Sequence, residues 1–414
     1  MPEHPFLYVG DGIGSELIRV CHQQGFTRFL LVADGNTYAA LGKAAESVLQ
    51  SQGWEVSSVV LVGPEVRADA DHIFDVLLRS DPMPHAYVAV GSGTLTDISR
   101  FCSHRLGLPF LSLPTAASVD GFTSIGAPLV IRDFKRTISC QGPMAIFADL
   151  GVLSAAPQRL TAAGVGDLLG KFTAVADWRL GHILRGERYN EAIAQRSLRA
   201  VQSLIPRIAQ VGHGDREGVR RLFEGLVETG LCMLDFGGSA PASGAEHHMA
   251  HFWEMRLLWQ HRPAQLHGAG VGYGCYLSAQ WYDALRAMSR DEAAAHLERA
   301  RRWERGWQEE EMRQVFGSVV DEVIHEQASF LSYTARSWGR LKQHILDNWD
   351  ELQAVAAQVP SSAQLREWLQ IAGASVSPQE LGLTTEDVTL ARQYAHYLRN
   401  RFTIAKLRLL LGIE

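Results

Sequence analysis

The sequence predicts an N-terminal α/β domain with a parallel sheet at residues 1–153 and an all-helical domain at residues 154–414. Over roughly the first 150 residues, short apolar runs alternate with amphipathic segments, a pattern typical of helices covering a parallel sheet. Beyond Ser154 the strand signals fade and long helical periodicities dominate. A length of 414 residues with 46% hydrophobic residues supplies enough apolar side chains for two cores.

Five apolar runs are the expected strands of the first domain, and amphipathic stretches such as 14–23 and 38–51 are expected helices between them. Residues 128–131 and 137–147 are expected to form a hairpin or an excursion before the chain leaves this domain. The expected strands are Phe6–Val9, Arg28–Ala33, Ser57–Leu61, Ala86–Ala89 and Phe110–Leu113.

The second domain is expected to consist of helices, and its charge-dense stretch at 291–314 is typical of a solvated helix face. We find no internal repeat and no low-complexity tract. The first expected helices of this domain are Gly166–Arg185, Glu191–Val211, Gly214–Leu234, Glu246–Gln260 and Gly272–Met288.

The composition excludes several classes of protein. Lys and Arg number 39 and Asp and Glu 45, interleaved along the chain, so the net charge of −6 argues against a nucleic-acid binder. The five scattered cysteines lack any CxxC spacing and favour reduced thiols in a cytoplasmic protein. We expect no signal peptide and no membrane insertion, because no stretch approaches about 18 consecutive apolar residues.

A Gly-Ser-Gly turn at Gly91, Ser92 and Gly93 joins a buried strand to a helix. Glycines at such a turn let backbone N–H groups approach a pyrophosphate, and the helix N-terminus favours the anion. The turn is not a GxGxxG fingerprint, so an ordinary tight strand–helix turn explains it equally well.

Polar residues also follow two other expected strands. Asp34 ends the second strand, where its carboxylate suits an adenosine ribose and favours NAD over NADP; a helix N-cap is the alternative reading. The loop after the strand at 110–113 suits ligand contact, although solvated turn chemistry looks similar. Its polar residues are Thr115, Ser118, Asp120, Thr123 and Ser124.

Three separate segments of the second domain carry metal-ligand residue types. Asp167 is expected in the first turn of a helix, His247 and His251 at i, i+4 on one helix face, and His267 in a glycine-bounded loop before another helix. A carboxylate and two imidazoles suit a divalent metal and leave positions open for water or substrate. The histidine pair alone is also typical of surface or packed core histidines.

Five blocks, in order along nearly the whole chain, resemble the sn-glycerol-1-phosphate dehydrogenases, particularly their bacterial branch. This family belongs to the superfamily of dehydroquinate synthases, glycerol dehydrogenases and iron-containing alcohol dehydrogenases. The C-terminal YLRNRFTIAKLRLLLG is also similar. The five blocks are GSGTLTD (91–97), PTAASVDGFTS (114–124), GDLLGKFTAVADW (166–178), SGAEHHMAHFWEM (243–255) and HGAGVGYG (267–274).

The resemblance implies a dehydroquinate synthase-like fold and assigns roles to individual positions. It implies metal ligands at Asp167, His247 and His267, and substrate contacts at Asp120, Asp167 and His251, of which Asp120 and His251 are the expected catalytic residues. The positions that match the family's NAD(P) contacts are Gly91, Ser92, Gly93, Thr94, Asp97, Thr115, Ser118 and Ser124.

The implied reaction is the reversible, metal-dependent reduction of dihydroxyacetone phosphate by NAD(P)H to sn-glycerol 1-phosphate, a step of phospholipid metabolism. Zinc or nickel suits the ligand set, with iron as an alternative metal. The expected partner is a small phosphorylated ketone or polyol, and the expected assembly is a homodimer. One departure concerns Ser92, which replaces the middle one of three glycines common in the family and requires a negative φ.

Other readings stay open. Lys171 and the cluster Arg132, Lys135 and Arg136 are candidates for the phosphate, and a solvated hairpin is the simpler explanation for at least two of that cluster. A superfamily member acting on glycerol or another small polyol or hydroxyketone is the main alternative. A dehydroquinate synthase-like lyase would need more cations near these motifs. A nucleotide-binding protein without turnover would have no need of the metal ligand set.

Overall fold

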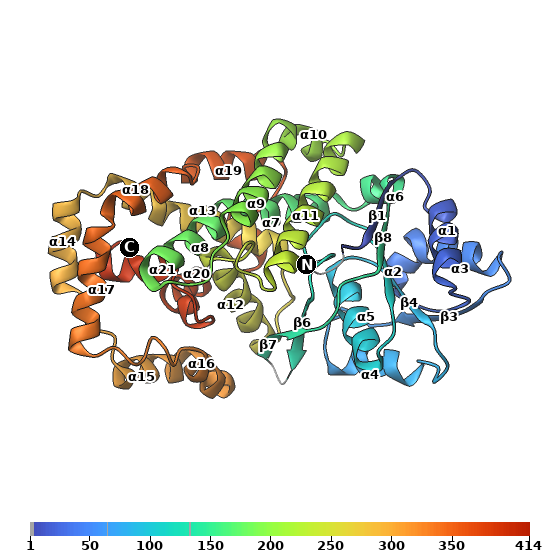
Figure 1. Cartoon of the computed structure of the whole chain (residues 1–414), viewed down its shortest axis with the longest axis horizontal. Coiled ribbons are helices and arrows are strands. Elements are labelled where there is room, and N and C mark those ends of the chain that lie inside the picture. Colours follow the sequence, from blue (N-terminus) through green and yellow to red (C-terminus); the bar gives the residue numbers. More distant parts are fainter. Residues whose placement is uncertain (1–3, 64, 132–133) are drawn as a thin grey trace. The chain divides into compact units, whose positions relative to one another are not determined.

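The computed structural model describes residues 4–63, 65–131 and 134–414. Contacts within the chain divide it into two compact units, whose helices and strands are labelled in Figure 1. Unit 1 consists of Met1–Leu168 and Gln202–Gly238, and unit 2 consists of Leu169–Val201 and Ser239–Glu414.

Unit 1 contains a six-stranded sheet in the order β1-β8-β5-β4-β2-β3, in which every pair of neighbouring strands is parallel. The remaining two strands form an antiparallel hairpin. The strands are β1 (Phe6–Gly10), β2 (Arg28–Asp34), β3 (Glu55–Leu61), β4 (Ala86–Val90), β5 (Phe110–Leu113), β6 (Gly126–Ile131), β7 (Phe134–Ser139) and β8 (Ala145–Asp149).

Helices cover both faces of this sheet, as Figure 1 shows. On one face, Leu17 of α1 and Leu49 of α3 pack against strand residues such as Leu31. On the other face, Val76 of α4 and Ile98 of α5 pack in a second apolar cluster. The helices at these positions and in 150–238 are α1 (Gly14–Gln24), α2 (Gly35–Thr37), η1 (Tyr38–Gly42), α3 (Lys43–Gln50), α4 (Ala70–Leu78), α5 (Gly93–Leu106), α6 (Leu150–Ala155), α7 (Gln158–Leu169), η2 (Ile205–Arg207), α10 (Ile208–Gly212) and α11 (Arg216–Phe236).

The predicted strands are confirmed, with one correction in the second half of the expected hairpin. Residues 145–149 do not belong to the hairpin; they form β8, which pairs in parallel with both β1 and β5 inside the main sheet. The run AIFAD is short and almost fully buried. Because β8 pairs with strands that are distant in sequence, its neighbours along the chain carried no signal of that pairing.

Unit 2 is helical, which confirms the predicted fold class of an α/β part followed by a helical part. The helix α9 (Glu191–Leu204) runs from unit 2 into unit 1. The other helices of unit 2 are α8 (Lys171–Arg185), α12 (Ala245–Trp259), α13 (His267–Ala287), α14 (Arg290–Arg299), α15 (Arg305–Phe316), η3 (Gly317–Val319), α16 (Val320–Glu326), α17 (Ala335–Asp347), α18 (Trp349–Ala357), α19 (Ser362–Ile371), η4 (Gln379–Leu381), α20 (Thr385–Tyr394), η5 (Ala395–Tyr397) and α21 (Ile404–Leu411).

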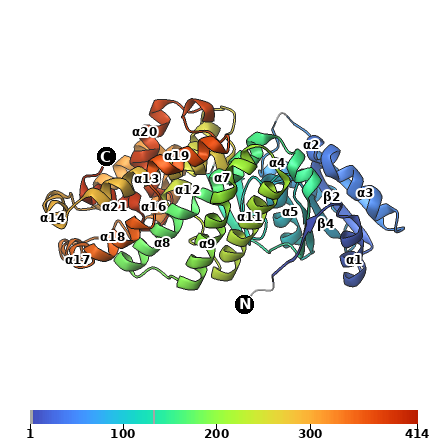
Figure 2. The same cartoon turned by 90° about the horizontal axis from the view of Figure 1, so that it is seen from above.

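Helices α12 and α13 lie side by side in unit 2 (Figure 2). A glycine permits their closest approach: a Cβ added to Gly274 would lie 2.6 Å from the carbonyl oxygen of Glu246. Any larger residue at position 274 must therefore push the two backbones apart.

Two predicted helix boundaries are wrong. The expected helix at 166–185 is two helices, α7 and α8, joined at Gly170, so that Asp167 lies in the last turn of α7 and not in a first turn. His267 does not lie in a loop, because it is the first residue of α13. The glycines after His267 look like a turn in the sequence, yet Gly270 and Gly274 lie inside α13, where they pack closely against neighbouring residues.

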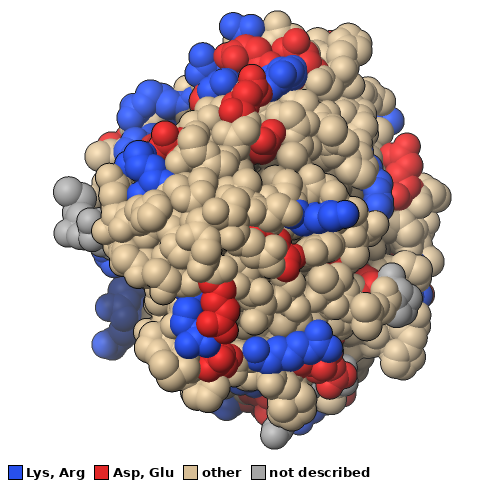
Figure 3. Space-filling model, turned by 90° about the vertical axis from the view of Figure 1, so that its right-hand side faces the viewer, with Lys and Arg blue, Asp and Glu red and all other residues tan. Residues whose placement is uncertain are grey.

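On the face that Figure 3 shows, basic and acidic side chains lie interleaved, in agreement with the mixed charge pattern of the sequence. Among the helices of the described residues, none has the length and apolar character that crossing a membrane requires.

Candidate active site

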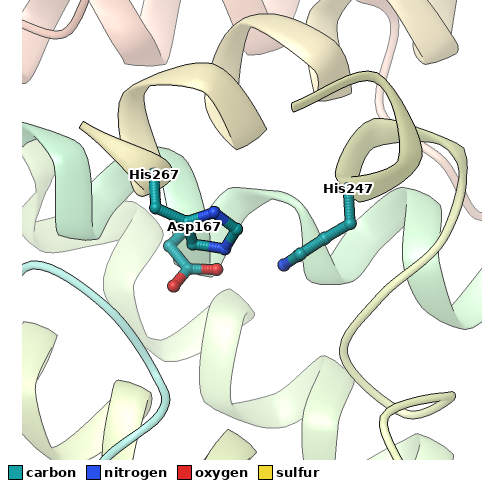
Figure 4. Close-up of side chains that lie close together, drawn as sticks. All are labelled: Asp167, His247 and His267. Carbon is teal, nitrogen blue, oxygen red and sulfur yellow. The ribbon is translucent and has the colours of Figure 1, made fainter. Parts of the chain in front are cut away.

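Three predicted metal ligands come together in the structure. Asp167 stands in the last turn of α7, His247 in the first turn of α12, and His267 at the start of α13. Each offers one ligand atom, and these atoms lie within 4.8 Å of one another (Figure 4). Asp167 and His247 are buried, whereas the side chain of His267 is 25% exposed. This geometry fits a divalent ion, which sits about 2 Å from each nitrogen or oxygen donor.

The Nδ1 atom of each imidazole lies within hydrogen-bonding distance of a carboxylate. The Nδ1 of His247 lies 2.8 Å from Glu246 Oε1, and the Nδ1 of His267 lies 2.8 Å from Glu254 Oε1. An imidazole that donates its Nδ1–H to a carboxylate keeps the lone pair of Nε2 for a metal. The chemistry of the donor set therefore fits a divalent metal ion.

The carboxylate of Glu246 is itself held firmly. Its oxygens accept hydrogen bonds from the Gly244 N–H at 2.5 Å and the Thr173 hydroxyl at 2.7 Å, and the residue is fully buried. Burial alone would raise the pKa of Glu246, but the adjacent imidazole of His247 brings this pKa below its ordinary value. Glu246 is therefore a fixed anionic acceptor for His247.

The N-terminus of α12 is anchored by a second buried carboxylate. Asp177 of α8 accepts hydrogen bonds from the Ala245 N–H at 2.7 Å, the Ile404 N–H at 2.6 Å and the Tyr282 hydroxyl at 2.7 Å. Burial and the nearby carboxylate of Glu246 raise the pKa of Asp177. One side chain thus ties α12 to the start of α21 and to α13, and it fixes the helix that carries His247.

The predicted substrate contact Asp120 lies beside the predicted metal ligand of the same unit. The backbone N–H of Asp120 donates to Asp167 Oδ2 at 2.9 Å. The loop is also pressed against α7, since a Cβ on Gly164 would lie 1.9 Å from the Ala117 carbonyl oxygen. The backbone of the Asp120 loop is therefore fixed in position next to the side chain of Asp167.

The predicted NAD(P) positions gather at the carboxyl ends of β4 and β5, which are neighbours in the sheet. Gly91 has a φ of 155°, which only glycine adopts readily, and Ser92 has a φ of −97°, so the serine is accommodated without strain. The hydroxyls of Ser92 and Ser118 lie 2.5 Å apart and join the two loops. Gly93 and Thr94 open α5, whose N-terminus faces this edge of the sheet.

The other predicted cofactor residues lie on the same two loops. The Thr115 N–H donates to the Gly91 carbonyl at 3.3 Å. The Ser124 hydroxyl donates to the Gly126 carbonyl at 3.2 Å. Both residues are buried, as is Ser118.

Asp97 is paired with a residue that our sequence analysis missed. Arg100, one turn later in α5, is fully buried and donates to Asp97 Oδ1 at 2.7 Å. Its guanidinium also donates to the carbonyls of Gly121, Phe122 and Gly126 at 2.6, 3.1 and 2.8 Å. Burial raises the pKa of Asp97 to about 7, and the charge of Arg100 opposes that rise. Arg100 thus organises the loop that carries Asp120.

Asp34 adopts the alternative role considered for it. It is the N-cap of α2, where its Oδ1 accepts from the Thr37 N–H at 2.8 Å and the Thr37 hydroxyl accepts from the Asp34 N–H at 3.0 Å. Capping occupies one carboxylate oxygen at the end of β2. A ribose contact of Asp34 stays a prediction.

The phosphate candidates lie in different settings. Lys171 is fully buried and donates to the Ala242 carbonyl at 3.1 Å, a bond that ties α8 to the segment before α12. Lys135 and Arg136 lie on the hairpin strand β7, and Arg132 lies outside the described residues. The position of Lys171 favours a structural role.

Glu246 and Glu254 were also missed, although the sequence carries a usable signal for both. Glu246 directly precedes His247, and Glu254 follows His251 by three residues on the same helix, where side chains meet. The Nδ1 of His251 lies 3.1 Å from Glu254 Oε2. Acidic neighbours at such spacings along a histidine-bearing helix would have identified them as imidazole partners.

Comparisons with known proteins identify relatives of the chain. A family model described as iron-containing alcohol dehydrogenase matches residues 8–157. A glycerol-1-phosphate dehydrogenase, NAD(P)+, of Geobacillus stearothermophilus is 34% identical over 403 residues, covering 96% of this chain and 90% of the relative. The enzyme of that name from Bacillus subtilis (strain 168) is 32% identical over 400 residues, covering 96% and 89%.

The fold has solved counterparts as well. The crystal structure of glycerol dehydrogenase from Schizosaccharomyces pombe aligns with a TM-score of 0.64 at 16% identity, covering 100% of this chain and 89% of that one. At this identity the likeness concerns the fold alone. With the relatives that match nearly its whole length, the chain belongs to the glycerol-1-phosphate dehydrogenase family.

Proposed function

We propose that the protein catalyses the reversible, metal-dependent reduction of dihydroxyacetone phosphate by NAD(P)H to sn-glycerol 1-phosphate. The observation that carries this proposal is the convergence of Asp167, His247 and His267, whose ligand atoms lie within 4.8 Å of one another. Full-length relatives named glycerol-1-phosphate dehydrogenase, NAD(P)+, support the choice of substrate and cofactor.

The metal would be held by one Asp167 oxygen and by the Nε2 atoms of His247 and His267. Glu246 and Glu254 support this reading because they occupy the two Nδ1 atoms. When bound, a divalent cation polarises the ketone oxygen and stabilises negative charge on it. Zinc and nickel suit the carboxylate and imidazole donors, and iron is the alternative named by the family model.

NAD(P)H, which supplies the hydride, would bind along the turn at Gly91 to Thr94 and the loop that carries Thr115, Ser118 and Ser124. The open backbone at Gly91 and the N-terminus of α5 suit a pyrophosphate. Asp97 contributes through its pair with Arg100, which shapes the loop. Asp34 at the end of β2 would contact the adenosine ribose through the carboxylate oxygen that does not cap α2.

Asp120 and His251 would orient the substrate and manage the proton. Asp120 is fixed through its N–H to Asp167, so its carboxylate projects from a rigid backbone. His251 is oriented by Glu254, which accepts from its Nδ1. The Nε2 of His251 would then face a substrate hydroxyl and transfer a proton during reduction.

We also propose that the enzyme is a homodimer, the most common symmetric assembly of soluble enzymes. Light scattering of the purified protein should give twice the mass of the chain. A concentration-independent mass of one chain would reject the dimer and leave the chemistry untouched.

The test of the reaction is a comparison of two ketones that differ only in the phosphate. NADH and NADPH oxidation is measured with dihydroxyacetone phosphate and with dihydroxyacetone, and the product is analysed for the sn-1 configuration. We expect kcat/KM for the phosphorylated ketone to exceed that for the free ketone by at least about a hundredfold, since a buried phosphate contact contributes several kcal/mol. Preference for the free ketone would contradict the proposal and favour a polyol dehydrogenase. An sn-3 product would contradict the proposed stereochemistry.

A further inference from the structure

One carboxylate, Glu254, contacts two of the proposed site imidazoles at once. Its Oε2 lies 3.1 Å from the Nδ1 of His251, which precedes it by three residues on α12, and its Oε1 lies 2.8 Å from the Nδ1 of His267 on α13. The two imidazole rings are stacked, with centroids 5.2 Å apart and planes 23° apart. Glu254 therefore bridges two helices and two rings whose proposed roles differ.

The paired Nδ1 contacts determine which nitrogen each ring leaves available. A carboxylate only accepts hydrogen bonds, so both rings must present Nδ1–H to Glu254. Each ring then keeps the lone pair of Nε2 on its opposite side. His267 would use that atom for the metal, and His251 would use it toward the substrate.

The other carboxylate of the site acts differently. Glu246 contacts a single imidazole, that of His247, and its remaining contacts are with the Gly244 N–H and the Thr173 hydroxyl. Glu246 is fully buried, whereas the side chain of Glu254 is 12% exposed. Glu246 thus holds one ring against the helical framework, and Glu254 holds two rings against each other.

We infer that Glu254 is a positioning residue that orients His267 for the metal and His251 for the substrate at the same time. This inference rests on the proposed metal-dependent reaction. Glu254 is neither a proposed metal ligand nor a proposed substrate contact, yet both metal affinity and proton transfer would depend on it. Loss of Glu254 should therefore weaken metal binding and slow proton transfer, whereas loss of Glu246 should disturb only the orientation of His247.

Glu254→Gln tests the inference, because an amide has a single acceptor oxygen. In that variant only one of the two rings can keep a hydrogen-bonded Nδ1–H, and the other meets an NH₂ donor, which favours the tautomer with the proton on Nε2. Nitrogen-15 NMR of labelled histidines in the metal-free protein should show one of these rings changing tautomer while His247 stays as it is. An unchanged set of tautomers would overturn the inference.

Metal affinity gives a second readout. Competition with a chromophoric chelator should show zinc bound 10- to 100-fold more weakly by Glu254→Gln than by the unaltered chain, the range found for carboxylates behind metal-bound histidines. Glu351→Gln, which removes a surface carboxylate paired with Arg179, should leave zinc affinity unchanged. Equal affinity in Glu254→Gln and Glu351→Gln would overturn the inference.

The same variants also test an alternative metal site that includes Glu254 as a ligand. His251, Glu254 and His267 form a second group with metal-ligand geometry, their ligand atoms also lying within 4.8 Å of one another. If that group were the true metal site, Glu254→Gln and His251→Ala would lose zinc completely while Asp167→Ala retained it, and the positioning role would be refuted. Failure of the reaction itself would appear separately, as an unaltered chain that binds zinc but does not reduce dihydroxyacetone phosphate.

Discussion

Predicted site residues are held in place by different means in the two units. In unit 1 the predicted cofactor and substrate residues lie on the loops after β4 and β5. The guanidinium of Arg100 donates hydrogen bonds to three backbone carbonyls of the segment after β5 and so holds it in place. In unit 2 the histidines stand on helices, and carboxylates hold their rings. The comparison indicates that the loop is fixed through its carbonyl groups, whereas the helix is fixed at its N-terminus and its imidazole rings are then oriented one by one.

The largest effect should come from removing the backbone clamp of unit 1. Arg100→Met removes the guanidinium from three carbonyls, of which that of Phe122 is buried, and leaves Asp97 without its cation, which should cost about 3–5 kcal/mol of local stability. Hydrogen exchange should accelerate at least tenfold in residues 114–126 and remain unchanged in α12. Arg105→Met, at an exposed arginine of the same helix, serves as the matched control.

A contrary result for Arg100 would be equally informative. If exchange in residues 114–126 stayed within twofold of the unaltered chain, the loop would be held by something other than the guanidinium. The double variant Arg100→Met with Asp97→Asn should recover part of the loss, because it no longer buries a lone carboxylate. No recovery would mean that the carbonyl contacts alone account for the effect.

The next largest effect tests the packing of helices in unit 2. Gly274→Ala places a Cβ 2.6 Å from the Glu246 carbonyl oxygen, so α13 must move away from α12. We expect a loss of about 3 kcal/mol in thermal or chemical denaturation, at the upper end for overpacking. Gly339→Ala in α17 meets no neighbouring atom and should stabilise by roughly 0.5–1 kcal/mol. Similar melting temperatures for the two variants would contradict the close approach of α12 and α13.

The smallest effect concerns acid stability in unit 2. Burial, together with the charges of Lys406 and Arg408, lowers the pKa of His396 well below its ordinary value. The unfolded chain takes up a proton near pH 6.5 and the folded chain does not, so stability is lost as the pH falls below 6.5. The free energy of unfolding falls by at most about 1.4 kcal/mol per pH unit. His396→Gln should flatten the decline of melting temperature between pH 7 and 5, and an unchanged slope would refute this reading.

Much of unit 1 could be predicted from the sequence because its strands are short apolar runs between turns. Residues 28–33 and 86–89 are of this kind, and their parallel pairing follows from the helices between them. The strand at 145–149 was misassigned because its partners β1 and β5 are distant in sequence. Pairing of that kind depends on the tertiary fold and leaves no local pattern.

Some residues of the candidate site could be predicted from the sequence and others could not. The resemblance brought Asp167, His247 and His267 together before any geometry was known. The partners of their rings could not be assigned, because contact between Glu254 and His267 depends on how α12 packs against α13. Arg100 was missed for a similar reason, since its contacts lie 21 to 26 residues away along the chain.

Metal content measured on four purified variants tests the central claim most directly. The unaltered chain should bind one divalent ion per chain by elemental analysis after dialysis against trace metal. Asp167→Ala, His247→Ala and His267→Ala should each lose that ion while remaining folded, and His251→Ala should keep it but reduce dihydroxyacetone phosphate far more slowly. Stoichiometric metal and full activity in Asp167→Ala and His267→Ala would contradict the account.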